Sequence, residues 1–255
     1  MNQAASSKPA KASLEALIEN YDIGVESFHP GGPGLTLELA ERCRVHRGSN
    51  VMDVASGAGA TACLIAKQFG CSVIGIDSSE HMLERARKKA SECGLAIEFR
   101  LGDAHALPAN DGSFDAVICE CTMCALNKQS ALKEMYRVLK PGGYAGIHDL
   151  CWKEGASARL RAALVELENE RPETLAGWKQ CFEQAGFRDV VVDDRSALLL
   201  PSLEQVRSQV SFLQRLKLSW AVVRRWGVRG LLRVLRSVRI CRSPFLGYGI
   251  IVGSK

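Results

Sequence analysis

The sequence predicts a single α/β domain built around a mostly parallel sheet. Short apolar segments alternate with longer segments in which apolar residues recur at helical spacing. Repeated strand–helix–strand order makes consecutive strands parallel, because the crossovers that join them are right-handed. A chain of 255 residues, 47% of them hydrophobic, is long enough for such a core and fits one domain with an insertion better than two domains.

The individual elements follow from the apolar runs and from the residues that end them. We expect strands at residues 50–54, 72–77, 97–101, 114–119, 144–148, 190–192 and 248–252. We expect helices at residues 35–45, 61–69, 129–139 and 175–186, and one more between Ser79 and Gly94. Pro141 and the glycines after it end the helix at 129–139, because proline cannot continue a helix. Residues 1–12 are small and polar, so we expect a disordered leader there and the folded domain at 13–255.

Composition indicates the compartment and the state of the cysteines. No segment approaches the roughly 20 apolar residues that a membrane-spanning helix needs, and the start lacks the apolar core of a secretory signal. We therefore expect a cytoplasmic protein. Its ten cysteines are then expected to be reduced thiols, several of them small core residues, rather than a disulfide framework.

A glycine turn and three carboxylates form a candidate nucleotide site. The first strand carries Asp53 and leads into Gly57 and Gly59, which let a ligand approach the backbone closely. Asp77 ends the second strand, where a carboxylate accepts hydrogen bonds from the ribose of either a nicotinamide or a sulfonium cofactor. Asp103 ends the third strand and can accept a hydrogen bond from an adenine amino group. Asp53 is expected to orient the turn and to add negative potential beside a cation.

Residues 49–150 resemble the class I S-adenosylmethionine (SAM)-dependent methyltransferases, especially small-molecule enzymes of the ubiquinone/menaquinone-methylase type. The stretches that carry the resemblance are residues 51–59, 75–77, 102–104, 114–117 and 136–143. Ala55-Ser56 stands where that family often has Gly-Cys. The resemblance implies a Rossmann-like sheet of seven strands with an antiparallel last strand, helices on both faces, and SAM as the cofactor.

The same resemblance implies which residues contact SAM. The expected contacts are Gly57, Gly59, Asp77, Ser78, Asp103 and Ala104, with the backbone of Cys119 and Glu120 near the methionine end. A nicotinamide oxidoreductase is a competing class, but its glycine fingerprint would lie nearer the N-terminus and it would have a second dinucleotide half. A non-catalytic SAM-binding module is the third interpretation.

The methyl acceptor is expected beyond the carboxyl ends of the fourth and fifth strands, where open parallel sheets bind ligands. Cys121, Cys124, Cys151 and His148 are expected to cluster there, with His29 closing over them from a Pro/Gly-rich loop. Methyl transfer is an in-line displacement, so the protein supplies alignment, desolvation and in some cases a base. An imidazole suits that role near neutral pH, and a structural role is the alternative for His148.

The cysteines suggest a soft acceptor. Residues 120–126, together with the following helix and Lys-Pro-Gly-Gly, are similar to the corresponding region of arsenite methyltransferases, which hold trivalent arsenic by thiolates before methylating it. Thiolates prefer soft centres, so arsenite, a thiol or a selenium compound is one predicted acceptor class. Alternatively, the cysteines line a pocket for O- or C-methylation of a lipophilic or quinone-like substrate. No metal site is expected, because the Cys-x-Cys-x-x-Cys run lacks the partner pair of a zinc site.

A basic segment precedes the last strand. Residues 203–242 hold ten basic side chains and one acid, and they are expected to form two amphipathic helices broken near Gly227, with Trp220 and Leu235 on their apolar faces. We expect this insertion to cover the substrate pocket. Peripheral contact with an anionic membrane, to reach a lipophilic substrate, is the alternative. No nucleic acid partner is expected, because no recognised nucleic-acid module is present.

Overall fold

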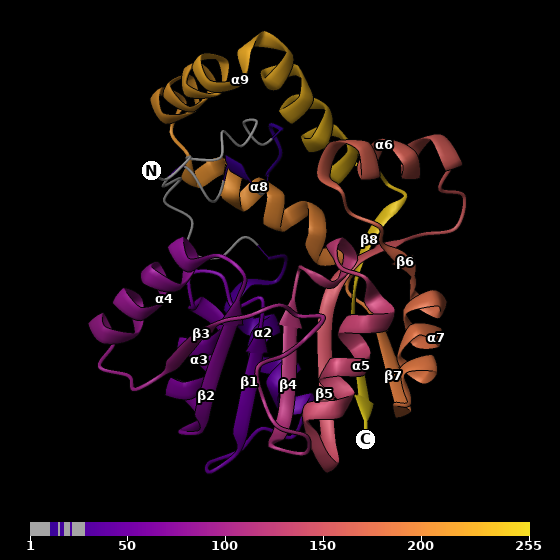
Figure 1. The fold of residues 1–255 in the computed structure, drawn as a ribbon. Coiled ribbons are helices and arrows are strands. Elements are labelled where there is room, and N and C mark those ends of the chain that lie inside the picture. The colour runs from indigo at the N-terminus through magenta and orange to yellow at the C-terminus, as the bar shows by residue number, and fades with distance from the viewer. Residues whose placement is uncertain (1–10, 15, 18–20, 22–28) are drawn as a thin grey trace, which may run out of the picture.

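The computed structural model describes residues 11–14, 16, 17, 21 and 29–255 (Figure 1). The leader predicted at 1–12 lies outside the described residues except for Lys11 and Ala12. Ala12 is buried in a small apolar cluster with Val222 and Val234, so this residue packs with the domain.

The described strands form one mixed sheet. They are β1 Asn50–Val54, β2 Ser72–Asp77, β3 Glu98–Leu101, β4 Phe114–Glu120, β5 Leu139–Trp152, β6 Glu173–Thr174, β7 Arg188–Asp194 and β8 Leu246–Ser254. The order is β3-β2-β1-β4-β5-β8-β7, and neighbours are parallel except for β5–β8 and β7–β8. The last strand, β8, is thus antiparallel, which confirms the predicted sheet. The short β6 pairs with β5 outside this path.

Helices cover both faces of the sheet. The α-helices of the described residues are α2 Gly32–Arg42, α3 Ala60–Phe69, α4 Glu80–Glu92, α5 Lys128–Val138, α6 Ala158–Glu168, α7 Leu175–Ala185, α8 Leu199–Gln209 and α9 Phe212–Cys241. The apolar stripes of α2, α3 and α4 pack on one face, and those of α5 and α7 pack on the other. Central strands such as β4 are consequently buried on both sides, which explains their nearly continuous apolar sequence.

The fifth strand is longer than predicted. Helix α5 ends at Val138, as expected before a proline, but β5 begins at once, at Leu139, and includes Pro141. The pairing of β4 with β5 shifts register between Phe114 and Ala116, and proline is tolerated in a strand at such an irregularity because no ladder bond from its nitrogen is needed there. The Pro-Gly-Gly segment is therefore part of β5, and the strand follows α5 directly.

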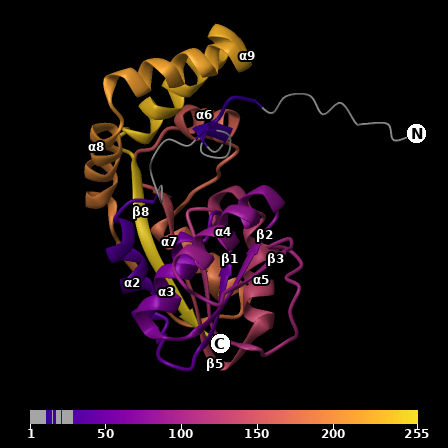
Figure 2. The same cartoon turned by 90° about the vertical axis from the view of Figure 1, so that its left-hand side faces the viewer.

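Helices α6, α8 and α9 form a separate layer beyond the carboxyl ends of the parallel strands (Figures 1 and 2). Helix α9 bends at Gly227, whose φ of 70° lies in the left-handed region, close to the predicted break. Its buried stripe includes Val222, Val234 and Ile240. The predicted apolar faces lie elsewhere: Trp220 is 64% exposed and Leu235 is 55% exposed. These two side chains therefore do not pack inward, because a different stripe of α9 does.

Candidate cofactor and acceptor site

The glycine turn and the second strand are joined by hydrogen bonds. The backbone N–H of Gly57 donates to Asp77 Oδ2 at 2.8 Å, and the N–H of Ser79 donates to Asp77 Oδ1 at 2.9 Å. Gly57 has a φ of 51° and Gly59 a φ of 78°, a region in which side chains are strained. A Cβ on Gly59 would also lie 2.9 Å from Ala86 Cβ. The turn thus requires glycine and lies directly against the carboxylate that ends β2.

Asp103 lies at the same edge of the sheet. Asp77 at the end of β2 is paired in the sheet with Leu101 at the end of β3. Asp103 therefore lies two residues past the end of β3. Its side chain is 66% exposed, and Oδ1 accepts from the His105 N–H at 2.9 Å and contacts the ring Nδ1 at 2.6 Å. These two hydrogen bonds lower the pKa of Asp103, so it is a carboxylate at neutral pH. Ser78, which follows Asp77, is exposed.

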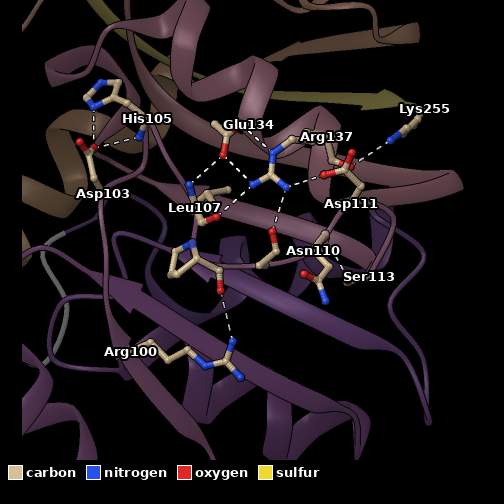
Figure 3. Close-up of polar contacts among 12 residues, drawn as sticks. Arg100, Asp103, His105, Leu107, Asn110, Asp111, Ser113, Glu134, Arg137 and Lys255 are labelled. Carbon is tan, nitrogen blue, oxygen red and sulfur yellow. Dashed lines mark hydrogen bonds and ion pairs between the residues drawn. The ribbon is translucent and has the colours of Figure 1, made fainter.

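The loop after Asp103 is anchored by one arginine of α5 (Figure 3). Arg137 donates to the carbonyl oxygens of Leu107 at 3.0 Å and Ala109 at 2.8 Å, and it forms an ion pair with Asp111. Glu134, which also pairs with Arg137, accepts from the Leu107 N–H at 2.8 Å. Arg137 and Glu134 therefore fix the loop that follows Asp103.

A second polar cluster surrounds the buried carboxylate of Glu120, at the end of β4. His148 lies beside it across the β4–β5 pairing, with Nε2 2.8 Å from Glu120 Oε1. The hydroxyls of Thr61 and Thr36 donate to Oε2 at 2.5 and 3.2 Å. His29, from the loop before α2, places Nε2 3.4 Å from Oε2. Residues from α2 with the loop before it, from α3 and from β5 thus meet at one carboxylate.

Tyr248 of β8 extends this cluster. Its hydroxyl makes a short hydrogen bond with His148 Nδ1 and another with the Cys121 thiol. Cys121 has a φ of 53°, unusual for a residue with a side chain, and such backbone is often found at functional sites. The rings of His29 and His148 lie 5.0 Å apart. We call the set His29, Glu120, Cys121, His148 and Tyr248 the Glu120 cluster.

Burial and neighbouring charges shift the pKa of Glu120 in opposite directions. Burial acts to raise the pKa of Glu120, but the neighbouring His148 and His29 and the Thr61 hydroxyl outweigh it and lower that pKa to about 2. Burial lowers the pKa of His29, so this imidazole is neutral at pH 7. Asp53, buried in β1, has its pKa raised by burial and by the charges of Glu120 and Asp77. A cation nearby would therefore be favoured electrostatically.

The predicted cysteine cluster forms only in part. Cys121 joins His148 and His29, as expected. Cys124 and Cys151 instead lie in the apolar core on the α5 and α7 side, together with Cys119. His148 and Cys151 are three residues apart on one strand and so point to opposite faces of the sheet. The expectation that Cys151 lies at the acceptor position is corrected on this ground.

Three of the Glu120 cluster's side chains have metal-ligand geometry. Within the described residues, one ligand atom each from His29, Glu120 and His148 lies within 4.8 Å of the others. The sequence prediction had no metal site, and it assigned Glu120 only a backbone role. It also missed Thr36, Thr61 and Tyr248, although a glutamate directly after the apolar run 114–119 is a signal for a functional side chain.

Comparison with known proteins identifies the family. Residues 51–143 match the family model described as a methyltransferase domain. A Haemophilus influenzae protein, itself described only as uncharacterized, is 34% identical over 66% of this chain and 70% of its own length. Phosphoethanolamine N-methyltransferase 1 of Zea mays is 28% identical over 69% of this chain, and the match spans 35% of the plant protein. This chain belongs to the methyltransferase-domain family.

The same architecture occurs in a solved structure of this family. The phosphoethanolamine N-methyltransferase 2 of Haemonchus contortus, in complex with SAM, superposes with a TM-score of 0.76 at 22% identity, over 94% of this chain and 57% of that one. This likeness confirms the predicted fold, and the SAM is a ligand of that neighbour. The sequence matches confirm the methyltransferase family.

The residues present fit that cofactor. Two buried oxygens near the glycine turn, Asp53 Oδ2 and Ser56 Oγ, have no hydrogen-bond partner among the described residues, and buried polar atoms are normally satisfied. The positive charge of SAM would also offset the buried carboxylates. By contrast, a hollow of about 540 Å³ lies at the opposite strand ends, where β1 and β2 begin, and is lined by residues such as Asn50 and Ser72. None of the candidate residues lines it.

Proposed function

We propose that this methyltransferase transfers the methyl group of SAM to a small organic molecule at the edge where β1 to β5 end. The observation that supports this most is the hydrogen bond from the Gly57 N–H to Asp77. It joins the glycine turn to a carboxylate at the same edge of the sheet as Asp103. In this assignment Asp77 accepts hydrogen bonds from the ribose hydroxyls and Asp103 accepts one from the adenine amino group. When bound, SAM supplies a methyl group on a positively charged sulfur.

The remaining predicted contacts lie along the same edge. Gly57 and Gly59 would approach the cofactor through their backbone, as would Ser78, Ala104 and Cys119. Asp53, together with Ser56, would accept from the amino group of the methionine portion. The negative potential of Asp53 and Glu120 would also stabilise the sulfonium.

The Glu120 cluster is the proposed acceptor site. The acceptor's lone pair forms a bond to the methyl carbon, the carbon–sulfur bond breaks, and its electron pair stays on the sulfur of S-adenosylhomocysteine. An acceptor O–H or N–H must also lose its proton, and a neutral imidazole beside Glu120 can receive it. Burial keeps His29 neutral, and the Tyr248 hydroxyl and Glu120 fix the ring of His148. Both histidines therefore remain candidates for the predicted catalytic role.

A soft acceptor is the second candidate, favoured by Cys121 in the Glu120 cluster. Binding arsenite requires thiolates. Burial raises the pKa of both Cys121 and Cys124 well above the usual range, so the thiols are protonated before an acceptor arrives. This favours the organic acceptor, which is why we place O-, N- or C-methylation first.

A turnover screen tests the function and the acceptor class together. Labelled SAM is incubated with phenols, quinone precursors, small amines, thiols and arsenite, and products are identified by mass spectrometry. We expect methylation of an organic acceptor. If arsenite is the substrate, Cys121→Ser must abolish turnover while sparing SAM binding. Tight SAM binding without transfer to any acceptor would favour the non-catalytic module, and binding of NAD in place of SAM would contradict the cofactor.

We propose further that α8 and α9 cover the acceptor site on one side and contact an anionic lipid bilayer on the other. Nine basic residues of this layer are exposed, and none of them forms an ion pair with a carboxylate among the described residues. They are Arg207, Arg215, Lys217, Arg224, Arg225, Arg229, Arg236, Arg239 and Arg242. Basic residues near an anionic membrane contribute about 1 kcal/mol each, so their sum is substantial.

Large apolar side chains are exposed between these basic residues. On the first half of α9 they are Phe212, Leu213, Leu216 and Trp220, and on the second half Val228, Leu232, Leu235 and Val238. Basic helices with exposed tryptophan and leucine lie in membrane interfaces with the apolar face inserted. A hollow of about 450 Å³ lined in part by Arg229 and Arg236 could receive an anionic headgroup. No helix in the described part of the chain is long and apolar enough to cross the membrane.

Vesicle sedimentation tests the membrane surface. We expect binding to vesicles containing phosphatidylserine and little binding to pure phosphatidylcholine. The double variant Trp220→Ser/Leu232→Ser should lose binding, whereas the control Val191→Ser, exposed on β7, should keep it. Equal sedimentation of the double variant and the parent protein would overturn the proposal.

A further inference from the structure

Three side chains that could bind a metal ion meet at the proposed acceptor site. His29, Glu120 and His148 come from the loop before α2, the end of β4 and the interior of β5. Their side chains are 10%, 6% and 0% exposed, so all three are held away from bulk water. Two imidazoles against one carboxylate is a recurrent donor set for first-row divalent metals.

The distances suit a bound ion. Ligand nitrogens and oxygens lie about 2.0–2.2 Å from zinc, so two ligands on one ion are roughly 3–4 Å apart. Here Nε2 of His148 lies 2.8 Å from Glu120 Oε1, and Nε2 of His29 lies 3.4 Å from Glu120 Oε2. An ion of this size therefore needs only small side-chain adjustments.

The surrounding contacts orient these ligand atoms. Metal-binding histidines normally use their second ring nitrogen in a hydrogen bond that fixes the tautomer. His148 Nδ1 meets the hydroxyl of Tyr248, which leaves Nε2 directed toward Glu120. The hydroxyls of Thr61 and Thr36 hold the carboxylate from the other side. The outer contacts expected of a metal site are therefore present for two of the three ligands.

We propose that His29, Glu120 and His148 bind one divalent transition-metal ion of the zinc, iron or manganese class. Three protein ligands leave coordination positions open, as in catalytic rather than structural sites. An acceptor oxygen bound there would lose its proton to solvent more easily and would be directed at the methyl group. The imidazoles argue against magnesium, which prefers oxygen ligands and retains its water. This inference rests on the proposed function for the ion's role in catalysis, where the ion would act in place of the imidazole base, whereas the binding itself can be tested without any acceptor.

Cobalt provides a spectroscopic test. The chelator-treated full-length protein is titrated with Co²⁺, followed by its visible d–d bands and, in parallel, by calorimetry. We expect stoichiometric binding without the near-ultraviolet thiolate charge-transfer band that cysteine ligands produce. His29→Gln and Glu120→Gln should each weaken binding by about tenfold or more, and Tyr248→Phe by about tenfold.

Matched controls separate this site from others on the protein. His81→Gln, an exposed histidine of α4, should bind Co²⁺ like the parent protein. Circular dichroism and thermal unfolding of each variant exclude loss of fold as the cause of lost binding. Absence of stoichiometric binding, a thiolate band, or unchanged affinity in both His29→Gln and Glu120→Gln would overturn the metal site. SAM binding and methyl transfer by metal-free protein would overturn the ion's catalytic role and leave the proposed function intact.

Discussion

Replacing Asp77 separates the two roles that the structure gives this carboxylate. In the protein alone, Asp77 accepts hydrogen bonds from the N–H groups of Gly57 and Ser79. In the proposed complex it also accepts from the ribose hydroxyls. Asp77→Ala removes every acceptor, whereas Asp77→Asn keeps one carbonyl oxygen and turns an amide donor toward one of its former partners.

The expected magnitudes follow from the number of hydrogen bonds lost. A hydrogen bond to a charged group contributes about 1.5–3 kcal/mol, and partial exposure of Asp77 reduces this through solvent screening. We therefore expect Asp77→Ala to lower the free energy of unfolding by about 1–3 kcal/mol. The lost ribose contact should weaken SAM by a further 1–3 kcal/mol or so, roughly 5- to 150-fold in Kd. Asp77→Asn should fall between the parent protein and Asp77→Ala.

Calorimetry with SAM and S-adenosylhomocysteine, combined with urea unfolding without ligand, resolves the two effects. Glu84→Ala, an exposed acid on α4, controls for the loss of one negative charge. If Asp77→Ala lowers stability but binds SAM as tightly as the parent protein, Asp77 is a turn residue only. The cofactor assignment at this edge would then be refuted.

Three further predictions concern the supporting structure. Arg137→Ala should release the loop that carries the adenine-side carboxylate and weaken SAM several-fold by calorimetry, whereas Lys133→Ala on the same helix should not; equal affinities would contradict the anchoring role. Glu120 has its folded-state pKa depressed to about 2, so its stabilising effect is present above its unfolded pKa near 4.5 and is lost as pH falls toward 2. The difference in unfolding free energy between the parent protein and Glu120→Gln should therefore shrink below pH 4.5, and a constant difference would argue against the shift. Gly59→Ala should destabilise the protein by about 1 kcal/mol or more in thermal unfolding, because both φ and space oppose a side chain, while Gly34→Ala, in open space on α2, should be neutral or stabilising; similar melting temperatures would count against the turn geometry.

The sheet could be predicted because its signals are local. Apolar runs mark the strands, and the glycines at 57 and 59 together with the acids at 77 and 103 mark the strand ends, which a parallel sheet brings to one edge. The start of β5 could not be predicted in this way, since its first residues are the Lys-Pro-Gly-Gly that normally ends a helix. Only the pairing with β4, with its register shift, makes that segment a strand.

The Glu120 cluster could be predicted only in part, because it is made by long-range contacts. The strand order already predicts that His148 and His29 lie near this edge, but nothing near Glu120 in sequence indicates that Thr36 and Tyr248 join them. Strand alternation, however, already separates His148 from Cys151, and applying it would have removed that cysteine from the expected cluster. For α9 the periodicity shows that apolar stripes exist, but not which stripe packs inward, since that depends on α6 and on Ala12.

A crystal structure of the complex with S-adenosylhomocysteine tests the central assignment most directly. We expect Asp77 to lie within hydrogen-bonding distance of both ribose hydroxyls, with the adenine amino group at Asp103 and the sulfur facing the Glu120 cluster. A nucleoside bound elsewhere, for example in the hollow beside Asn50 and Ser72, with Asp77 touching only its own turn, would contradict it.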